Sequence, residues 1–233
     1  MRFDPPLIAA TLIRRYHRFL ADVRLASGAV VTVHCPNPGR MAGCCTPGSP
    51  VRFADSGNPK RKLRFTWELV HTGITWVGVN TLRANAIVRE ALAAGVIIEL
   101  AGYPEVRPEV RYGAHSRVDF LLTRGSSRCY VEVKNVTLAT AGCAMFPDAV
   151  TGRGLTHLHE LAKRVAAGDR AVMVYLVNRD DCDRFAPAAH IDPAYAAGLA
   201  EAVAAGVEVV VYAARVRPAR ITVARRIRHV RVE

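Results

Sequence analysis

The chain has 233 residues and a formal net charge of +12, and 51% of its residues are hydrophobic. This hydrophobic fraction excludes a disordered chain, and the length allows one large domain or two small ones. A balance this basic favours a polyanionic partner, nucleic acid before a membrane surface, although an arginine-rich, GC-biased composition would give the same charge without any such target.

The N-terminal segment does not have the pattern of an export signal. Asp4, Pro5 and Arg14 interrupt its apolar residues, and no apolar run in the chain approaches the ~20 residues that span a membrane. We therefore expect a cytoplasmic protein with no membrane attachment. Its six cysteines form no CxxC pair and are expected to be reduced thiols. A zinc site from His34 and Cys35, Cys44 and Cys45 is an open alternative, but its spacing differs from that of a zinc knuckle.

Residues 1–82 are predicted to form a small β-barrel of the OB type. The segment contains short β-prone runs that are bounded by Gly, Pro, Asn or Asp, a pattern typical of barrel strands. The predicted strands are Tyr16–Leu25, Ala29–Cys35, Pro50–Ala54, Arg64–His71 and Thr75–Val79.

OB folds often bind single-stranded nucleic acid through a basic groove and aromatic side chains. The basic residues predicted to contact phosphate are Arg14, Arg15, Arg18, Arg40, Lys60, Arg61 and Lys62. For residues 60–62 the competing interpretation is a solvated loop. The Pro- and Gly-rich segment 34–48 is either a ligand loop, in which Arg40 contacts phosphate, or a tight connection of the barrel. A third possibility is a metabolite pocket at this loop, for which the sequence specifies no ligand.

Residues 83–233 are predicted to form a second domain, in which helices pack on a mixed sheet. Its element order is α-β-β-β-α-β-α-β. The predicted helices and strands are 83–95, Val106–Tyr112, Arg117–Thr123, Arg128–Val136, Arg153–Ala167, Arg170–Val177, 192–205 and Val207–Ala213. The arginine-rich tail from Arg215 is either an edge strand or a solvated end.

Two of these strands carry acidic residues in an apolar context. Asp119 lies in the second strand of the domain, and Glu132 lies in the third, two positions before Lys134. Residues i and i+2 of a strand face the same side, so Glu132 and Lys134 project together, and a hairpin would bring Asp119 beside them. Burying two carboxylates is unfavourable unless they pair or bind a metal, which indicates a functional site.

This order of elements, with Asp on the second strand and Glu-x-Lys on the third, resembles the PD-(D/E)XK nuclease-like superfamily. The resemblance implies a Mg²⁺ ion, for which Mn²⁺ could substitute, held by Asp119, Glu132 and the carbonyl of Val133, with Glu90 as a further acid from the preceding helix. Lys134 would then activate water or offset phosphate charge in phosphodiester hydrolysis. A structural ion pair of Glu132 with Lys134 is the alternative interpretation.

A second resemblance covers most of the chain. The segments that carry it are PPLIAATLIRRYHRFLADV (5–23), HCPNPGRMAGCCTPG (34–48), KRKLRFTWEL (60–69), VNTLRAN (79–85), RVDFLL (117–122), YVEVKNVTL (130–138) and FPDAVTGRGLTHLHEL (146–161). They resemble the sugar fermentation stimulation protein A family. The resemblance implies an OB-like domain, a PD-(D/E)XK-like domain, and a DNA-binding protein linked to the regulation of sugar (maltose) metabolism. Pro38, Gly152 and Thr156 depart from the family pattern, which has Thr, Glu and Lys there.

The segment from residue 153 contains three further polar candidates. Arg153, at the start of its helix, is predicted to contact a phosphate near Asp119 and Glu132. His157 and His159 are two residues apart and point in different directions on a helix, so they do not form a shared metal site. For each histidine, exposure or a structural hydrogen bond is the preferred interpretation. The two functions predicted from the sequence are therefore DNA binding and Mg²⁺-dependent phosphodiester hydrolysis.

Overall fold

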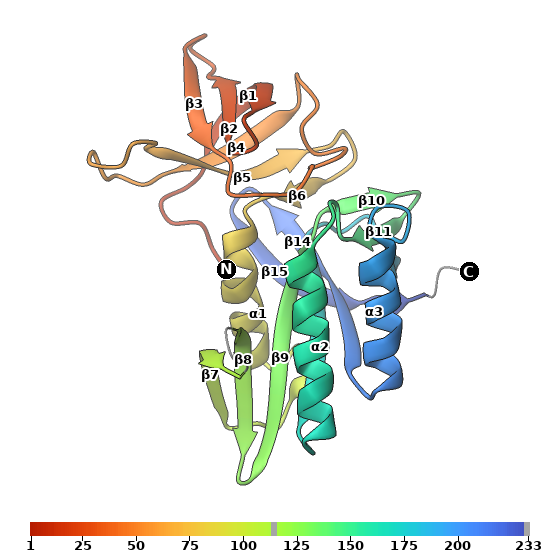
Figure 1. Ribbon diagram of the computed structural model, residues 1–233. Helices are drawn as coiled ribbons and strands as arrows, with labels where there is room; N and C mark the ends of the chain where they lie inside the picture. Colours follow the sequence, from red (N-terminus) through yellow and green to blue (C-terminus); the bar gives the residue numbers. More distant parts are fainter. Residues whose placement is uncertain (113–115, 231–233) are drawn as a thin grey trace.

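The computed structural model describes residues 1–112 and 116–230. Two domains are stacked, with a β-barrel above an α/β domain (Figure 1). Among the described residues, no helix is both long and apolar enough to cross a membrane.

The barrel is an OB-like domain with six strands. These are β1 (Ile8–Tyr16), β2 (Leu20–Arg24), β3 (Val30–His34), β4 (Pro50–Asp55), β5 (Phe65–His71) and β6 (Trp76–Gly78). Their order is β3-β2-β1-β4-β5-β6, and a parallel pairing of His34 with Thr66 joins β3 to β5. This pairing closes β1–β5 into a barrel around apolar side chains that include Leu12, Val51 and Trp67.

The start of the barrel differs from the sequence prediction. The segment Tyr16–Leu25 is not one strand, because β1 ends at Tyr16 and a turn precedes β2; β1 itself was not predicted. The turn uses His17 and Arg18 with φ values of 46° and 63°. Non-glycine residues seldom adopt this left-handed conformation, so the sequence carries no glycine signal for the turn.

The second domain contains a mixed sheet, as expected, and this sheet has six strands. Its elements are a 3₁₀ turn η1 (Thr81–Arg83), α1 (Ala84–Ala93), a 3₁₀ turn η2 (Ile98–Leu100), β7 (Glu105–Arg111), β8 (Arg117–Arg124), β9 (Ser127–Val136), α2 (Gly152–Ala166), β12 (Arg170–Val177), α3 (Pro193–Ala204), β14 (Glu208–Arg217) and β15 (Arg220–Arg226). The strand order is β15-β14-β12-β9-β8-β7. The strands β9, β12 and β14 are parallel, and the outer pairings are antiparallel.

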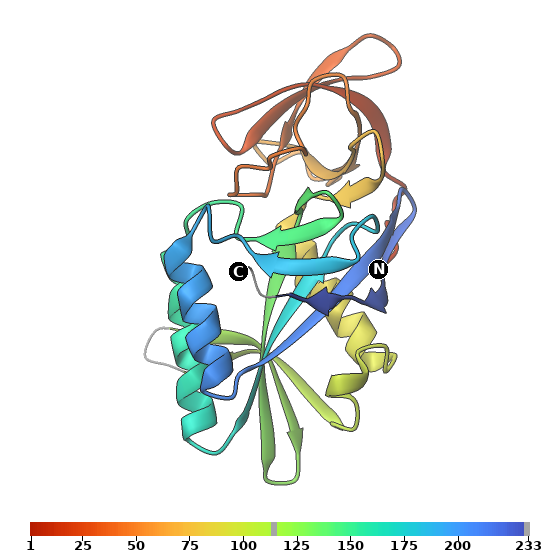
Figure 2. The same cartoon turned by 90° about the vertical axis from the view of Figure 1, so that its right-hand side faces the viewer.

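The helices cover both faces of this sheet. Helix α1 packs on one face, and α2 and α3 pack on the other (Figure 2). Val131 and Val133 of β9 point toward the α1 side, whereas Tyr130 and Val136 belong to the core under α2 and α3. The alternation of a strand therefore directs Glu132 toward α2.

Four short strands form a small sheet that was not predicted. They are β10 (Leu138–Thr140), β11 (Cys143–Phe146), β13 (Arg184–Pro187) and β16 (Arg228–His229). The tail from Arg215 is an edge strand rather than a solvated end, because β14 continues to Arg217 and β15 pairs at the sheet edge. The part of the tail prediction that falls on residues 231–233 lies outside the described residues.

Several hydrogen bonds join the two domains. Thr75 Oγ1 donates to Asp180, and the backbone amide of Gly78 donates to the carbonyl of Asn178 over 2.9 Å. The N-terminal segment crosses to the second domain, where Phe3 packs in the core under α1. The barrel is thereby fixed over the end of the sheet at which β9 and β12 finish.

Candidate active site

Asp119 on β8 is held by two hydrogen bonds. Its Oδ2 accepts from the backbone amide of Val133 over 2.7 Å, and its Oδ1 accepts from Asn85 Nδ2 of α1 over 2.7 Å. Burial raises the pKa of Asp119, and the negative charge of Glu132 raises it further. The two carboxylates are therefore close enough to interact, and both line one cavity.

Glu132 on β9 is only 3% exposed. Its Oε1 accepts hydrogen bonds from Lys134 Nζ over 2.8 Å and from His157 Nδ1. Burial raises the pKa of Glu132, but the bonds and charges of His157 and Lys134 outweigh this effect, and the net pKa is lowered. Its second oxygen, Oε2, is buried and has no hydrogen-bond partner among the described residues.

His157 joins Glu132 to the start of α2. The side chain of Thr151 caps this helix by accepting from the Gly154 amide, and Asp192 accepts from the Thr151 amide. One turn later, His157 lies on the buried face, where Arg153 Nε donates to its Nε2 over 3.3 Å. This contact leaves the Nδ1 proton for Glu132 in the neutral ring.

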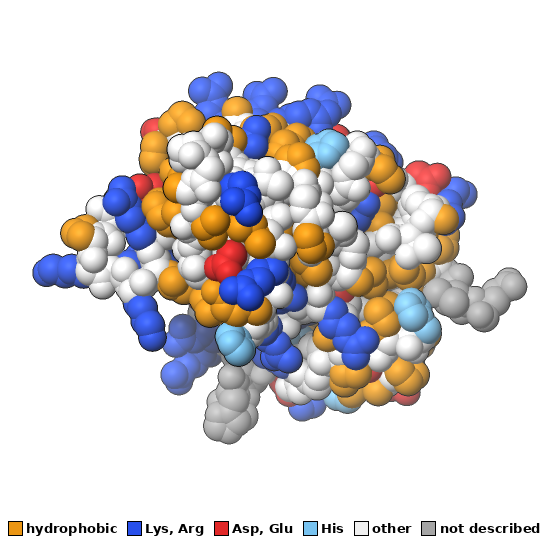
Figure 3. All heavy atoms as spheres, turned by 90° about the horizontal axis from the view of Figure 1, so that it is seen from above, with side chains coloured by type: hydrophobic (Ala, Val, Ile, Leu, Met, Phe, Trp, Pro, Cys, Tyr) orange, Lys and Arg blue, Asp and Glu red, His pale blue; other side chains and the backbone are white. Residues whose placement is uncertain are grey.

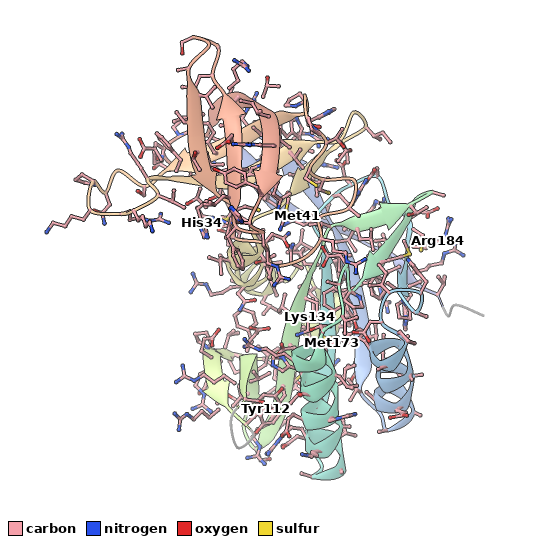
Figure 4. The ribbon with its side chains drawn as sticks, turned by 45° about the horizontal axis from the view of Figure 1, so that its top comes forward. His34, Met41, Tyr112, Lys134, Met173 and Arg184 are labelled. Atoms are coloured by element: carbon pink, nitrogen blue, oxygen red, sulfur yellow. The ribbon has the colours of Figure 1, made fainter. Side chains whose placement is uncertain are left out.

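These side chains line a cavity of about 540 Å³ between the domains. The second domain contributes Asp119, Glu132, Val133, Lys134, Asn135, Arg153 and His157, among others, and the barrel loop contributes Asn37, Pro38 and Gly39. In Figure 4, Lys134 lies near the barrel end of β9, and Met41 of the barrel loop lies above it. The barrel loop therefore roofs the cavity at the end of β9.

A divalent cation suits this donor set. Asp119 and Glu132 supply carboxylate oxygens, and the unpartnered Oε2 of Glu132 is a buried acceptor that a cation would satisfy. Among the described residues, no group of three or more His, Cys, Asp or Glu side chains could hold a metal. The third protein ligand that the nuclease-like resemblance implies is the backbone carbonyl of Val133, a residue that also lines the cavity.

Glu90 lies outside this group. Its side chain is 59% exposed and pairs with the amino group of Met1, because the buried face of α1 presents Ala84, Ile87, Val88 and Ala91 instead. The residues of α1 that line the cavity are Ala84 and Asn85, and Asn85 is the polar one. Gly152 and Thr156, the departures on α2, do not line the cavity, whereas Pro38 does.

The arginines and lysines that were predicted to contact phosphate have different structural roles. Arg15 donates to the carbonyls of Asn37, Gly39 and Arg40 over 2.9–3.1 Å, so it shapes the barrel loop. Arg14 pairs with Asp22 over 2.8 Å. Arg153 lines the cavity. The other predicted contacts, at Arg18, Arg40, Lys60, Arg61 and Lys62, are exposed. Seen from the barrel side, basic side chains surround this face (Figure 3).

The sequence did not indicate that Asn85 and Asn135 line the cavity. For His157 it favoured exposure or a structural hydrogen bond, and the structure has a buried hydrogen bond, to Glu132. His157 follows Gly154 by three positions and precedes Leu161 by four, so helical spacing could have placed it on the buried face. Asn135 Nδ2 is buried and unpartnered beside the cavity, while its Oδ1 accepts from Asn178 over 3.0 Å. No local signal distinguishes these two asparagines from structural ones.

Comparison with known proteins gives matches along nearly the whole chain. Residues 13–79 match the family described as SfsA N-terminal OB domain, and residues 82–220 match the sugar fermentation stimulation protein RE domain. A sugar fermentation stimulation protein homolog of Geobacter sulfurreducens is 55% identical over 95% of both chains. One from Paramagnetospirillum magneticum is also 55% identical, over 94% of this chain and 93% of its own.

A solved structure shares the whole architecture. It is described as the structure of Pyrococcus furiosus SfsA in complex with Ca²⁺. The TM-score is 0.89 at 25% identity, over 98% of this chain and 97% of the other. With two domain matches in order and relatives above 50% identity, the chain belongs to the sugar fermentation stimulation protein (SfsA) family.

Proposed function

We propose that the protein hydrolyses phosphodiester bonds of nucleic acid, with DNA as the first candidate substrate. The reaction uses a divalent cation, Mg²⁺ or Mn²⁺, held at Asp119 and Glu132. The observation that carries the proposal is the buried, unpartnered Oε2 of Glu132 in a cavity that also contains Asp119 and Lys134. The structure of Pyrococcus furiosus SfsA is a complex with Ca²⁺, which supports a cation in this fold. Ca²⁺ and Mg²⁺ both prefer oxygen ligands.

The residues of the chain have separable roles in this proposal. Asp119, Glu132 and the Val133 carbonyl hold the cation, which supplies Lewis-acid stabilisation of phosphate charge. The Asn85 side chain and the Val133 amide fix the orientation of Asp119. His157 fixes Glu132, and Arg153 fixes His157. Lys134, 13% exposed, orients the attacking water and offsets the negative charge that develops on the phosphate.

The test is hydrolysis of labelled single- and double-stranded DNA and RNA in Mg²⁺ or Mn²⁺, with EDTA as the metal-free reference. Glu132→Gln and Lys134→Met should each reduce the rate by at least about a hundredfold. Glu201→Gln on the exposed side of α3 and Lys163→Met, 67% exposed, should leave it unchanged. Cleavage that survives in Glu132→Gln would come from a contaminant. A folded protein that cleaves none of these substrates would overturn the proposal.

A second candidate is DNA binding without cleavage, linked to the regulation of sugar (maltose) metabolism. The net charge of +12 and the exposed residues Lys60, Arg61 and Lys62 in the β4–β5 loop favour it. Neutralising all three should flatten the salt dependence of DNA affinity by about 0.7 per lost phosphate contact on single strands. An unchanged slope would remove this loop from the interface.

A further inference from the structure

A second cavity, of about 340 Å³, lies between the N-terminal segment, the barrel and η1. Its basic lining residues are Arg2, Arg61 and Arg83, which come from three separate segments of the chain. Cavities from roughly 300 Å³ upward accommodate small-molecule groups. Neither the cation site nor the hydrolysis proposed above uses this cavity.

The charges around the second cavity leave an excess of positive charge. Two of its three carboxylates are already paired: Glu68 accepts from Arg83 over 2.7 Å, and Asp55 pairs with Arg64. Asp4 is the third carboxylate. Three arginines and three carboxylates line the cavity, and Arg64, which pairs with Asp55, lies outside the lining. Arg2 and Arg61 form no ion pair among the described residues and outnumber Asp4, the one lining carboxylate without an ion pair there. Such unpaired arginines suit a phosphate.

Uncharged polar groups complete the lining. Burial lowers the pKa of His34, and the positive charge of Arg61 lowers it further, so the ring is neutral at pH 7. Ser56, Thr66 and Asn80 add hydroxyl and amide groups. A neutral imidazole and hydroxyls suit the hydrogen bonds of a sugar or a base edge. In Figure 4, His34 lies where the barrel meets the top of α1.

Leu82 links the second cavity to the candidate active site, because it lines both. Its side chain is 74% exposed, yet its backbone is fixed. The Leu82 amide donates to Asn80 Oδ1 over 3.0 Å, and the neighbouring Thr81 donates to the Pro36 carbonyl over 2.7 Å. An exposed apolar side chain on a fixed backbone between two polar cavities is suited to contact or separate nucleic-acid bases.

We propose that the second cavity is a subsite for the nucleotide adjacent to the one at Asp119 and Glu132, so that one single strand crosses Leu82 between the two cavities. Arg2 and Arg61 contact its phosphate, and Leu82 contacts its base. This inference takes its ligand class, nucleic acid, from the proposed function, and it adds the position and the single-stranded form of the substrate. Barrel residues line part of both cavities, and a base that packs on Leu82 between them is exposed as in a single strand.

The experiment measures binding of fluorescein-labelled single-stranded DNA to the full-length protein by anisotropy, in EDTA, so that hydrolysis does not enter. Arg2→Ala/Arg61→Ala should weaken binding about tenfold and reduce the salt slope by about 0.7, because both arginines contact one phosphate. Leu82→Ala should weaken it about tenfold through the lost base contact. The matched controls are Arg107→Ala/Arg117→Ala and Ile98→Ala, all exposed on the second domain.

Unchanged affinity in Arg2→Ala/Arg61→Ala or in Leu82→Ala would overturn the subsite, and so would an equal loss in the matching control. A duplex of the same sequence should bind at least about tenfold more weakly than the single strand, and equal affinity would refute the single-stranded form. Because the measurement excludes metal, these results are independent of catalysis. A protein that shows the expected losses but never cleaves DNA would lose only the hydrolytic proposal.

Discussion

The carboxylate of Asp148, in the loop before α2, accepts a hydrogen bond of 3.1 Å from the backbone amide of Met41 in the barrel. The same carboxylate lies directly against Gly39, where the Cβ of an alanine would be 2.1 Å from Asp148 Oδ2. The barrel loop that roofs the cavity is thus docked on the segment that leads to Arg153 and His157. A change in this contact would move one wall of the site relative to the other.

Gly39→Ala is expected to open this contact, because the new methyl group and the Asp148 carboxylate cannot occupy the same space. We expect a loss of roughly 1–3 kcal/mol in the free energy of unfolding, typical of overpacking, together with faster proteolysis at the domain junction. Urea unfolding and limited proteolysis would measure the two effects. The control is Gly152→Ala, where a Cβ meets nothing within 4 Å and helix propensity improves. Equal stability of the two variants would contradict the tight docking.

Asp180→Asn should show a pH-dependent loss of stability. Burial raises the pKa of Asp180, but hydrogen bonds from Thr75 and Arg217 outweigh this, and the net pKa is lowered. A lowered folded-state pKa contributes stability that is complete above the unfolded value of about 3.9 and is lost as pH falls through the folded value. The variant should therefore be less stable by about 1–2 kcal/mol at pH 7 and nearly equal to the parent at the acidic limit.

Denaturant unfolding from pH 7 downward would follow this difference. The comparison variant is Asp183→Asn, since Asp183 is 63% exposed and, within residues 1–112 and 116–230, its one ion pair is with Arg184 at 3.2 Å. The Asp183→Asn substitution should change the free energy of unfolding only slightly at every pH. A difference for Asp180→Asn that stays constant with pH would show that the ion pair and the Thr75 bond do not carry the effect.

Much of the fold could be predicted because long apolar runs are bounded by turn residues. Strands β9 and β12 and helix α2 carry their periodicity within a single segment, so their positions follow from local sequence. The small sheet of β10, β11, β13 and β16 could not be predicted in this way. Its strands are two to four residues long, and only tertiary pairing stabilises them.

The candidate site likewise contains residues that local sequence places and residues that only tertiary packing places. Strand alternation is enough to place Glu132 beside Lys134, because both lie on one face of β9. The partner of Glu132 on α2, His157, is 25 residues further along the chain and is brought in by packing. On α1, the register of the helix against the sheet decides that Asn85 and not Glu90 meets Asp119. A single sequence does not encode that register in a local pattern.

The cysteines should divide into reactive and protected groups. Burial raises the pKa of Cys44, Cys129 and Cys182 to about 12, and it also raises that of Cys35. Thiolate is the reactive form, so these four should resist iodoacetamide at pH 8 in the folded protein. The half-buried Cys45 and Cys143 should be alkylated first. Peptide mass spectrometry would identify the sites, and urea should expose all six. Early alkylation of Cys44 or Cys129 would contradict the burial of these thiols.

A divalent cation should stabilise the folded protein, because it would relieve the repulsion between two buried carboxylates and satisfy Glu132 Oε2. A cation present at about 100 times its dissociation constant adds about 2.7 kcal/mol to the free energy of unfolding, which raises Tm by roughly 5–10 °C in a chain of this size. Thermal unfolding in EDTA, Mg²⁺ and Ca²⁺ would measure this rise. Glu132→Gln and Asp119→Asn should abolish it, whereas Glu90→Gln should retain it, because Glu90 lies outside the cavity and pairs with the amino terminus. A rise in Tm that depends on Glu90 and not on Glu132 would place the cation elsewhere in the molecule.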